Sequence, residues 1–360
     1  MHVKEGIRIA SFNIEKFGDK SVELKAGQYS RKDLDMIAKI ISENLIDIVA
    51  IQEITHQYAL KELIQKLSVS TVDVIRLPNE GQTAEIYACK SSTWEGRWAK
   101  PRSIYSDRAA EGYAFLWNKK TTQLVTNYNK KVFEPRIGYR VKKGALVRPP
   151  FIGRFRPIHG YYEIRIINSH IAWDAPKDVK NENDIDLMTQ YRLRDLRINE
   201  LTALIDTVYI GFEKKHYDVD GYDTCALPMP AYTFLLGDYN LNLPGIGQGA
   251  KMPPELAVRK IDRDEIVTVN AELTTLKDMP DEPESKRTYE NPLANNYDHF
   301  SYNKNTLIHH NIADPQVGVV YAFDYYAKDE TEDKSKYDLY KDKVSDHLPI
   351  ILDIDIRKKR

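Results

Sequence analysis

Hydrophobic and polar positions alternate along the chain in short blocks that predict many strands and few helices. Two segments rich in Ile and Val, residues 7–14 and 46–54, flank a stretch at 33–45 in which apolar residues recur every three or four positions. This spacing predicts a strand, a helix and a second strand. A further amphipathic helix is predicted at 58–67.

Shorter apolar runs predict additional strands. They lie at 84–90, 113–118, 123–133, 151–155, 161–173, 232–240, 297–302, 317–323 and 348–356. One long helix is predicted at about 186–209, and because Arg192, Arg194 and Arg197 stand beside apolar residues there, its charged face is expected to be solvated. Many strands with few helices predict a sandwich of mixed sheets covered by helices.

The chain shows no internal repeat and no linker rich in Gly and Ser, which predicts a single domain over residues 1–360. Two acidic stretches, 277–286 and 327–338, are expected to be surface loops rather than domain junctions.

The charges of the chain nearly cancel, because 52 Lys and Arg face 53 Asp and Glu. Without a global positive field, any polyanion has to be met by a local patch. A candidate patch at 130–156 contains Glu134 as its only acid, although an exposed edge hairpin protected by charge would give the same pattern. Its basic residues are Lys130, Lys131, Arg136, Arg140, Lys142, Lys143, Arg148, Arg154 and Arg156.

The sequence leaves the cellular compartment open. Cys89 and Cys225 are the only cysteines, and one disulfide between them is conceivable, whereas no pairing of cysteines with histidines suggests a metal site. No apolar run approaches the roughly 20 residues that cross a bilayer, so we expect a soluble protein, either cytoplasmic or secreted after loss of a leader.

Polar side chains end several of the predicted strands, and together they suggest a site. These residues are Asn13, Gln52, Glu53, His170, Asp238, Asn240, Asn242, Asp298, Asp346 and His347. Each of them alone is more simply a turn former or a cap, but their joint appearance at strand ends favours a site. Carboxylate and amide oxygens suit a hard cation such as Mg²⁺, and histidines beside it can transfer protons during attack on phosphorus.

Eight motifs in one order resemble the endonuclease/exonuclease/phosphatase superfamily, and within it they most resemble the deoxyribonuclease I group. They read FNIEKFG, IVAIQE, EGYAFLW, RPPF, NSH, GDYNLN, YDHF and SDHLPI, and the resemblance runs from about residue 7 to 356. The resemblance implies an α/β fold, a four-layer αββα sandwich in which two packed mixed β-sheets are flanked by helices.

The same resemblance implies a role for each matched residue. Glu53 would be the main metal ligand, completed by Asn13 and Asp346, while Asp238 and Asn240 would orient the attacking water or a second cation. Two histidine–carboxylate pairs, His170 with Glu111 and His347 with Asp298, would flank the scissile phosphate. Arg148, with Asn13 and Asn240, would contact that phosphate. The implied cofactor is Mg²⁺, with Mn²⁺ or Ca²⁺ as alternatives.

The motifs depart from deoxyribonuclease I at two places that would enter the minor groove of DNA, where this chain has Thr55 and Ala109. Single strands, RNA or another binding geometry therefore become alternatives to duplex DNA. Trp94, Trp98 and Tyr105 could stack on bases, or they could be packing anchors.

The sequence thus predicts a monomeric, metal-dependent phosphodiesterase that hydrolyses DNA as an endonuclease. The alternatives are a single-strand nuclease or ribonuclease, a phosphatase or lipid phosphodiesterase of the same superfamily, and a catalytically silent binding module. Which histidine accepts a proton and which donates one stays open at this stage.

Overall fold

The computed structural model describes sixteen stretches of the chain. They are residues 6–18, 32–78, 84–101, 111–126, 131–138, 146, 148–160, 162–171, 187–214, 230–242, 258–261, 264–269, 272–277, 292–310, 312–326 and 335–355. All ten residues that the motif resemblance marks as site residues lie within them.

The first of two sheets is built from both ends of the chain. Its strands are β1 (Gly6–Phe17), β2 (Ile48–Ile54), β3 (Asp73–Arg76), β4 (Glu85–Lys90), β5 (Trp94–Lys100), β6 (Gly112–Asn118), β15 (Gln316–Val319) and β16 (Ile350–Asp355). They run in the order β15-β16-β1-β2-β6-β5-β4-β3. β1 and β2 are parallel, so Asn13 on one strand faces Gln52, the residue before Glu53, on the other.

The second sheet carries the remaining site strands. Its strands are β7 (Thr122–Leu124), β8 (Arg136–Ile137), β9 (Phe151–Pro157), β10 (Glu163–His170), β11 (Ala231–Asp238), β12 (Val258–Ile261), β13 (Asp264–Val269) and β14 (Asp298–Asn303). The order is β12-β13-β14-β11-β10-β9-β7, and β8 also pairs with β9. Parallel pairing of β10 with β11 sets His170 directly opposite Asp238, and antiparallel pairing of β11 with β14 sets Asp238 opposite Asp298.

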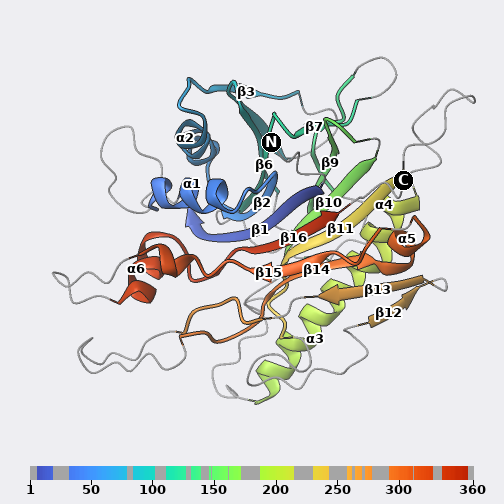
Figure 1. Cartoon of the computed structure of the whole chain (residues 1–360). Coiled ribbons are helices and arrows are strands. Elements are labelled where there is room, and N and C mark those ends of the chain that lie inside the picture. The colour runs from blue at the N-terminus through green and yellow to red at the C-terminus, as the bar shows by residue number, and fades with distance from the viewer. Residues whose placement is uncertain are drawn as a thin grey trace, which may run out of the picture.

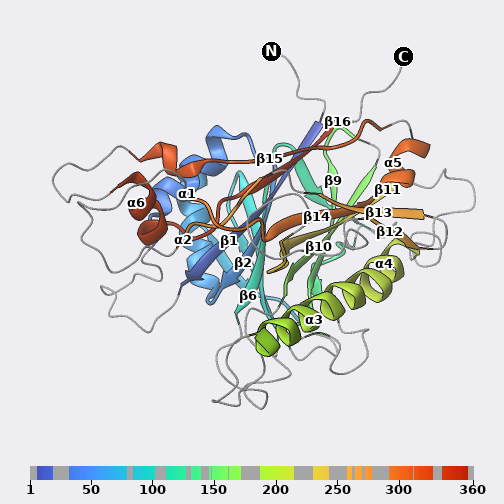
Figure 2. The ribbon, with the colours of Figure 1, turned by 90° about the horizontal axis from the view of Figure 1, so that it is seen from below.

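Helices cover the outer faces of both sheets. The helical segments are α1 (Leu34–Glu43), α2 (Gln57–Ser68), α3 (Leu187–Ala203), the π-helical η2 (Leu204–Tyr209), α4 (Ile210–Lys214), α5 (Lys304–His309), the 3₁₀ turn η5 (Ala322–Tyr325) and α6 (Lys336–Lys343). α1 and α2 lie on the side of β1, β2 and β6, whereas α3 and α4 lie on the side of β10 and β11 (Figures 1 and 2). The layers are therefore helix, sheet, sheet and helix, and the predicted four-layer sandwich is confirmed.

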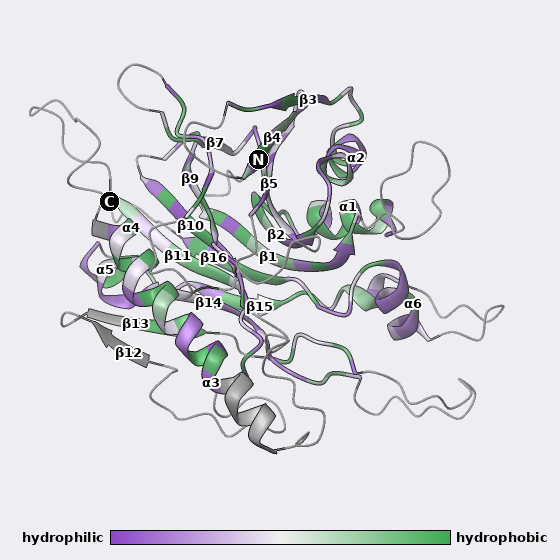
Figure 3. Ribbon diagram, turned by 180° about the vertical axis from the view of Figure 1, so that it is seen from behind, coloured by the Kyte–Doolittle hydropathy of each residue, from purple (hydrophilic) through white to green (hydrophobic). Residues whose placement is uncertain are grey.

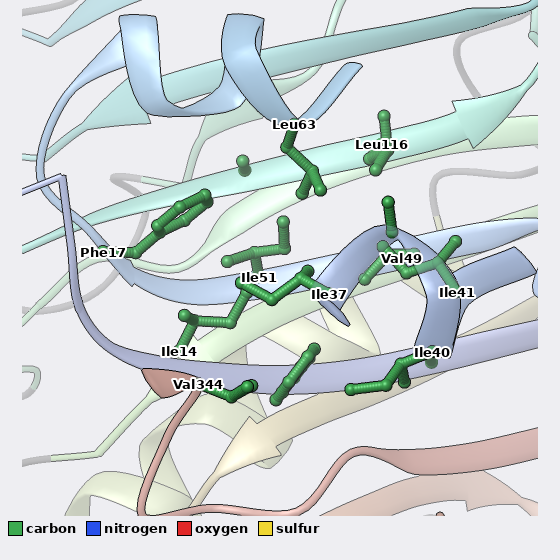
Figure 4. Close-up of a cluster of buried hydrophobic side chains, with 14 of the residues drawn as sticks. Ile14, Phe17, Ile37, Ile40, Ile41, Val49, Ile51, Leu63, Leu116 and Val344 are labelled. Atoms are coloured by element: carbon green, nitrogen blue, oxygen red, sulfur yellow. The ribbon is translucent and has the colours of Figure 1, made fainter. Parts of the chain in front are cut away.

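The layer between α1 and the first sheet shows how the sequence pattern becomes packing. Ile37, Ile40 and Ile41 are buried on one face of α1, where Ile37 and Ile41 lie beside Ile51 and Val49 of β2 and Ile40 lies over β1 (Figure 4). The helix begins at Asp33, whose carboxylate accepts the backbone N–H of Met36 at 2.9 Å. Such a cap contributes about 1 kcal/mol.

Aromatic side chains fill the space between the two sheets. The ring of Phe115 from the first sheet lies 4.9 Å from Phe151 and 5.3 Å from Phe155 of the second, measured between centroids. Each of these three side chains is fully buried. The central strands are accordingly largely hydrophobic, while α6 at the edge is largely hydrophilic (Figure 3).

One buried polar pair also joins the sheets, directly beneath the site strands. Gln52 Nε2 donates to Asn168 Oδ1 at 2.7 Å, and Asn168 Nδ2 donates to the carbonyl oxygens of Ile51 (3.0 Å) and Ala114 (3.3 Å). Both amides have no exposed surface. Because buried amides favour a defined set of partners, this pair fixes how one sheet is placed over the other.

Several elements differ from the sequence prediction. The strands β3, β5, β8, β12 and β13 and the helices α5 and α6 were not predicted. The strand predicted at 123–133 is wrong beyond β7, which ends at Leu124, and the segment predicted as a strand at 317–323 ends after β15 and turns into η5. α6 starts inside the stretch 327–338 that was predicted as a loop, because Ser335 caps it by accepting the N–H of Asp338 at 3.2 Å. The rest of that stretch and residues 278–286 lie outside the described residues.

Two further expectations concern the chain as a whole. Cys89 is a free, buried thiol, so the conceivable disulfide to Cys225 is not formed. Among the described residues, no helix has the length and apolar character needed to cross a membrane. The single domain over 1–360 stays a prediction.

Candidate active site

The carboxyl ends of the parallel strands from both sheets meet at one place. Asn13 on β1 joins them, because its Nδ2 donates to Glu53 Oε1 at 3.0 Å and to Asp238 Oδ2 at 3.1 Å. Glu53 belongs to the first sheet and Asp238 to the second. The site is therefore shared by both sheets.

His170 at the end of β10 lies against two charged side chains, those of Arg148 and Glu111. Its Nδ1 is 2.5 Å from Arg148 Nη1 and 3.4 Å from Glu111 Oε2, and Arg148 Nη1 is 2.7 Å from the same Glu111 oxygen. The backbone N–H of His170 donates to the Tyr113 hydroxyl at 3.1 Å, which fixes the main chain beneath the ring.

His347 forms the second histidine–carboxylate pair. Its Nδ1 is 2.8 Å from Asp298 Oδ2. The other ring nitrogen, Nε2, is 3.6 Å from Asp238 Oδ2, and Nε2 of His170 lies at the same distance from that oxygen. One carboxylate oxygen thus stands between the two imidazoles.

The serine of the SDH motif holds His347 close to β1. Ser345 is fully buried. Its hydroxyl donates to the carbonyl oxygen of Asn13 at 2.7 Å and accepts a hydrogen bond from the backbone N–H of His347 at 3.0 Å. Asp346 between them is half-buried, with Oδ1 at 3.5 Å from the same hydroxyl. Its charge acts on Lys16 and His347, raising the pKa of both.

Three residues around the site have left-handed backbone conformations. These are Lys16 (φ 50°), Glu53 (φ 60°) and Asn240 (φ 51°). The backbone N–H of Lys16 donates to Glu53 Oε2 at 3.3 Å, so its conformation serves the same carboxylate that Asn13 holds. A side chain other than Gly or Asn in this region costs roughly 1–2 kcal/mol, which is typical of functional sites.

Burial and neighbouring charges shift the protonation of the site. Burial raises the pKa of Glu53, and the charge of Glu111 adds to this effect, although His170 opposes it. Burial also acts to raise the pKa of Glu111, but the hydrogen bond and charge of His170 and the charge of Arg148 outweigh it and lower that pKa to about 2. Burial would lower the pKa of His347, yet Asp298 and Asp238 raise it well above its ordinary value.

The donor set fits a hard divalent cation. Single ligand atoms of Glu53, Glu111 and His170 lie within 4.8 Å of one another. Asn13 Oδ1 and Asn240 Oδ1 are buried, and neither has a hydrogen-bond partner among the described residues. Buried acceptors without donors, beside carboxylates, are the environment that Mg²⁺ or Mn²⁺ satisfies.

The structure brings Asn13, Glu53 and Asp238 of the expected metal set together, and it adds Glu111 and His170 to Glu53. Asn240 follows the same strand as Asp238, with its backbone N–H donating to Asp238 Oδ1 at 2.8 Å. The metal ligands and the catalytic roles stay predictions.

The basic stretch at 130–156 is not one free surface. Arg154 forms an ion pair with the fully buried Glu163, with N–O distances of 2.5 and 2.8 Å. Arg148 points into the site instead. Lys130, Arg140, Lys142 and Lys143 lie outside the described residues.

Trp94 and Trp98 do not face a substrate, because both are buried, and the indole N–H of Trp98 donates to the carbonyl oxygen of Ile54 at 3.1 Å. They are packing anchors, which was one of the two alternatives. Thr55 binds the carbonyl oxygen of Phe17 through its backbone N–H (2.7 Å) and its hydroxyl (3.1 Å). Tyr105 and Ala109 lie outside the described residues.

Sequence reasoning missed three supporting residues, Tyr113, Ser345 and Arg197. Tyr113 and Ser345 stand within or next to the matched motifs, so their positions gave a signal that was not used. Arg197 lies on α3 and donates to the carbonyl oxygen of Asn240 at 2.9 Å. The expectation that this arginine belongs to a solvated face is wrong, because helical periodicity does not show which turn of a helix meets a loop.

Solved structures of endonuclease/exonuclease/phosphatase proteins, the family that the motifs resemble, are among those to which this chain is similar. A protein of that description from Bacteroides vulgatus is 11% identical, with 98% of this chain and 100% of that chain covered and a TM-score of 0.47. TDP2 from C. elegans is 13% identical, with 97% and 75% covered and a TM-score of 0.45. D. rerio TDP2 in complex with a single-strand DNA product is 12% identical, with 98% and 100% covered and a TM-score of 0.46.

No family model matches the chain, and no curated protein does. At these identities and with TM-scores below 0.5, the similarity supports no conclusion about the activity of this chain. The chemistry therefore has to be argued from the side chains of this site.

Proposed function

We propose that the protein is a metal-dependent phosphodiesterase that cleaves nucleic acid, with DNA as the substrate, by attack of an activated water on phosphorus. One observation carries the proposal: Asp238 Oδ2 lies 3.6 Å from Nε2 of His170 and 3.6 Å from Nε2 of His347. Each imidazole has its own carboxylate on the opposite nitrogen, Glu111 at 3.4 Å and Asp298 at 2.8 Å.

The excess of carboxylates explains the need for a cation. Glu53, Glu111, Asp238 and Asp298 surround a space in which Arg148 is the permanent cation among the predicted site residues. A phosphate would be repelled by this field. A bound divalent cation, held by Glu53 with Asn13 and its neighbours, would offset the negative charge and polarise the P–O bonds.

The side chains of the chain itself can supply the proton transfers. Asp298 holds Nδ1 of His347, and Arg148 and Glu111 hold Nδ1 of His170, so both rings keep Nε2 directed at the space around Asp238. One ring accepts the proton of the attacking water as the new O–P bond forms. The other donates a proton to the leaving oxygen as the old P–O bond breaks.

Arg148 connects this chemistry to substrate binding. Its guanidinium lies on His170 and Glu111 with 16% of the side chain exposed, so it can reach an incoming phosphate from the same position. A planar guanidinium binds a phosphate through two N–H groups and stabilises the charge that develops on it. Because the chain has Thr55 and Ala109 at the two places that would enter the minor groove, DNA would have to be bound without those contacts, and single strands, RNA or another binding geometry are the alternatives to duplex DNA.

The test is cleavage of matched labelled substrates with Mg²⁺, Mn²⁺ or EDTA. Double-stranded DNA, single-stranded DNA and RNA are compared, together with the variants His170→Ala and His347→Ala. We expect internal cutting of DNA that requires the cation and is lost in both variants while their melting temperatures stay within a few degrees of the wild type.

Cutting that persists in EDTA, or turnover near the wild-type level in either variant, would contradict the mechanism. Cutting of RNA alone would keep the phosphodiesterase and replace the substrate. Absence of cutting of all three polymers would overturn the nuclease and direct the search to phosphorylated lipids and small molecules.

A further inference from the structure

Helix α3 reaches the candidate site through the side chain of Arg197. Its Nη1 donates to the carbonyl oxygen of Asn240 at 2.9 Å, and its guanidinium also hydrogen-bonds the side chain of Tyr297. Burial raises the pKa of Tyr297, and this hydrogen bond opposes the effect. Because Asn240 follows Asp238 and Tyr297 precedes Asp298, one guanidinium ties together the two segments that carry these aspartates.

The hydrogen bond from Arg197 adds to two others that hold Asn240 in place. The backbone N–H of Asn240 donates to Asp238 Oδ1 at 2.8 Å, and its Nδ2 donates to the carbonyl oxygen of Ile171 at 2.9 Å. With Arg197 on the carbonyl oxygen, three of the four polar atoms of Asn240 are held. The fourth, Oδ1, is buried and has no hydrogen-bond partner within the described ranges.

The geometry of Asn240 would not persist without such support. Its φ of +51° lies in the left-handed region, which asparagine tolerates at some cost. The carbonyl that Arg197 binds is part of the same residue, so the contact directly opposes a return to a right-handed or extended conformation. A return would move the backbone N–H of Asn240 away from Asp238 Oδ1, to which it donates.

We propose that Arg197 is a positioning residue for the phosphodiesterase reaction: it holds Asn240 so that Oδ1 is the acceptor presented to the attacking water or the cation beside Asp238. This inference rests on the proposed function. It also gives α3 a role in the site, although Arg197 itself touches no reacting atom.

Packing of α3 does not depend on this arginine. Leu201 of α3 and Leu204 at the start of η2 are buried in a hydrophobic cluster. The same cluster contains Tyr239 and Leu241, the neighbours of Asn240 on either side. Replacement of Arg197 therefore leaves the helix seated while it frees the carbonyl of Asn240. This separation allows a positioning role to be told apart from a structural one.

The first measurement is steady-state cleavage by Arg197→Met, which keeps the apolar stem, and by Arg197→Lys, which keeps a donor. We expect kcat of Arg197→Met to fall about tenfold or more with little change in KM, and Arg197→Lys to recover part of the loss. Asn199→Ala, an exposed change on the same helix, is the matched control and keeps the wild-type rate.

A double-variant cycle connects the effect to Asn240. If Arg197 acts through that residue, Arg197→Met in the Asn240→Ala background costs no further activity. Independent, additive losses would overturn the inference, as would wild-type kcat in Arg197→Met.

Hydrogen exchange of the peptide 236–242 tests the contact without any substrate. We expect faster exchange of the amides of Tyr239 and Asn240 in Arg197→Met than in Asn199→Ala, since these amides donate to the carbonyl oxygen of Tyr297 and to Asp238. Unchanged exchange would refute the positioning of Asn240 even if the wild type cleaves nothing. Lack of cleavage by the wild type alone would refute the proposed function.

Discussion

Individual residues at the site are held in conformations that the chain would avoid elsewhere. Gly237, one residue before Asp238, has φ +138°, and an added Cβ would lie 1.8 Å from the carbonyl oxygen of Ser169. The close approach belongs to the parallel pairing of β10 with β11 that sets His170 opposite Asp238. Glycine is therefore required by both the backbone angle and the space.

Gly237→Ala is expected to destabilise the protein by about 4 kcal/mol or more, because the clash is with main chain and cannot be relieved by a side-chain rotation. Gly211→Ala is the control: it lies in α4, where an added Cβ meets nothing within 4 Å. There we expect a gain of about 0.5–1 kcal/mol from helix propensity. Chemical denaturation of both variants checks the contrast, and equal effects would contradict it.

At Glu53, the proposed role as a metal ligand would lower the stability of the folded protein without the cation. Burial and the charge of Glu111 raise its pKa. A carboxyl whose pKa is raised by folding favours the folded state only at low pH, and its ionised form weakens that state at neutral pH.

Glu53→Gln is therefore expected to unfold at a temperature equal to or higher than that of the wild type in EDTA at pH 7. In Mg²⁺ we expect the order to reverse, since the wild type alone gains stability from the cation, and cleavage by the variant is lost. Thermal melts with and without Mg²⁺ decide this. A marked drop of the melting temperature in EDTA would show that Glu53 is a structural residue.

At the scale of the elements, an ion cluster connects β9, β10 and the end of α4. Glu163 is fully buried and pairs with Arg154 and with Arg165, whose Nε lies 2.8 Å away. The Arg165 guanidinium also donates to the carbonyl oxygen of Phe212 in α4 at 2.5 Å. Burial acts to raise the pKa of Glu163, but the two arginines outweigh it and lower that pKa.

Because folding lowers this pKa, the cluster stabilises the protein above the pKa of an unfolded glutamate, about 4.3, and loses its effect as the pH falls. Glu163→Gln is expected to cost about 3 kcal/mol at pH 7, since it leaves two arginines without their carboxylate. The difference from the wild type should shrink below about pH 4. Urea unfolding across this pH range measures it.

The control for this prediction is the exposed pair of Arg76 and Glu85, whose N–O distance is 3.0 Å. Glu85→Gln is expected to change the free energy of unfolding by less than about 0.5 kcal/mol at every pH. A comparable loss in both variants would contradict the importance of burial.

The elements also show where the sequence was informative. Strong periodicity predicted α1, β1 and β2, since their apolar residues have one partner face. It missed α6, whose residues alternate without a hydrophobic stripe and which depends on the cap at Ser335. It also missed β5, because Trp94 and Trp98 read as loop aromatics until their burial is known.

For the site, the ends of the predicted strands identified the polar residues, but not their distances. The position of Asp238 between two imidazoles follows from the register of β10, β11 and β14, which a single sequence does not encode locally. Arg197 could not be found in this way, because its partner is a backbone carbonyl that leaves no residue-type signal.

At the scale of the whole molecule, the site depends on how two sheets are aligned. Glu53 and Asn13 come from one sheet, and His170 and Asp238 come from the other. The bridge from Gln52 to Asn168 crosses between them at 2.7 Å, one and two residues away from Glu53 and His170. The alignment of the sheets and the candidate site are thus specified by neighbouring side chains.

Asn168→Leu is expected to cost about 2–3 kcal/mol, since it removes the acceptor 2.7 Å from Gln52 Nε2 and the amide that donates to the buried carbonyl oxygens of Ile51 and Ala114. The pair Gln52→Leu with Asn168→Leu should cost less than the sum of the single changes. We also expect kcat to fall in each variant, because the two halves of the site are no longer aligned. Additive losses of stability would show that the amides do not act as a pair.

The pairing of β1 with β16 has a practical consequence. Gly6 and Asp355 lie opposite each other in adjacent strands, and Asn13 lies seven residues farther along β1, about 23 Å away in an extended strand. Gly6 and Asp355 thus lie at the end of the first sheet that is remote from the candidate site. A short peptide could therefore join residue 355 to residue 6. New ends could be made at a surface turn such as the one between β6 and β7. The resulting circular permutant would keep the candidate site intact. A dye or an immobilising group fixed at the same edge would leave the reaction centre open to a long polymer.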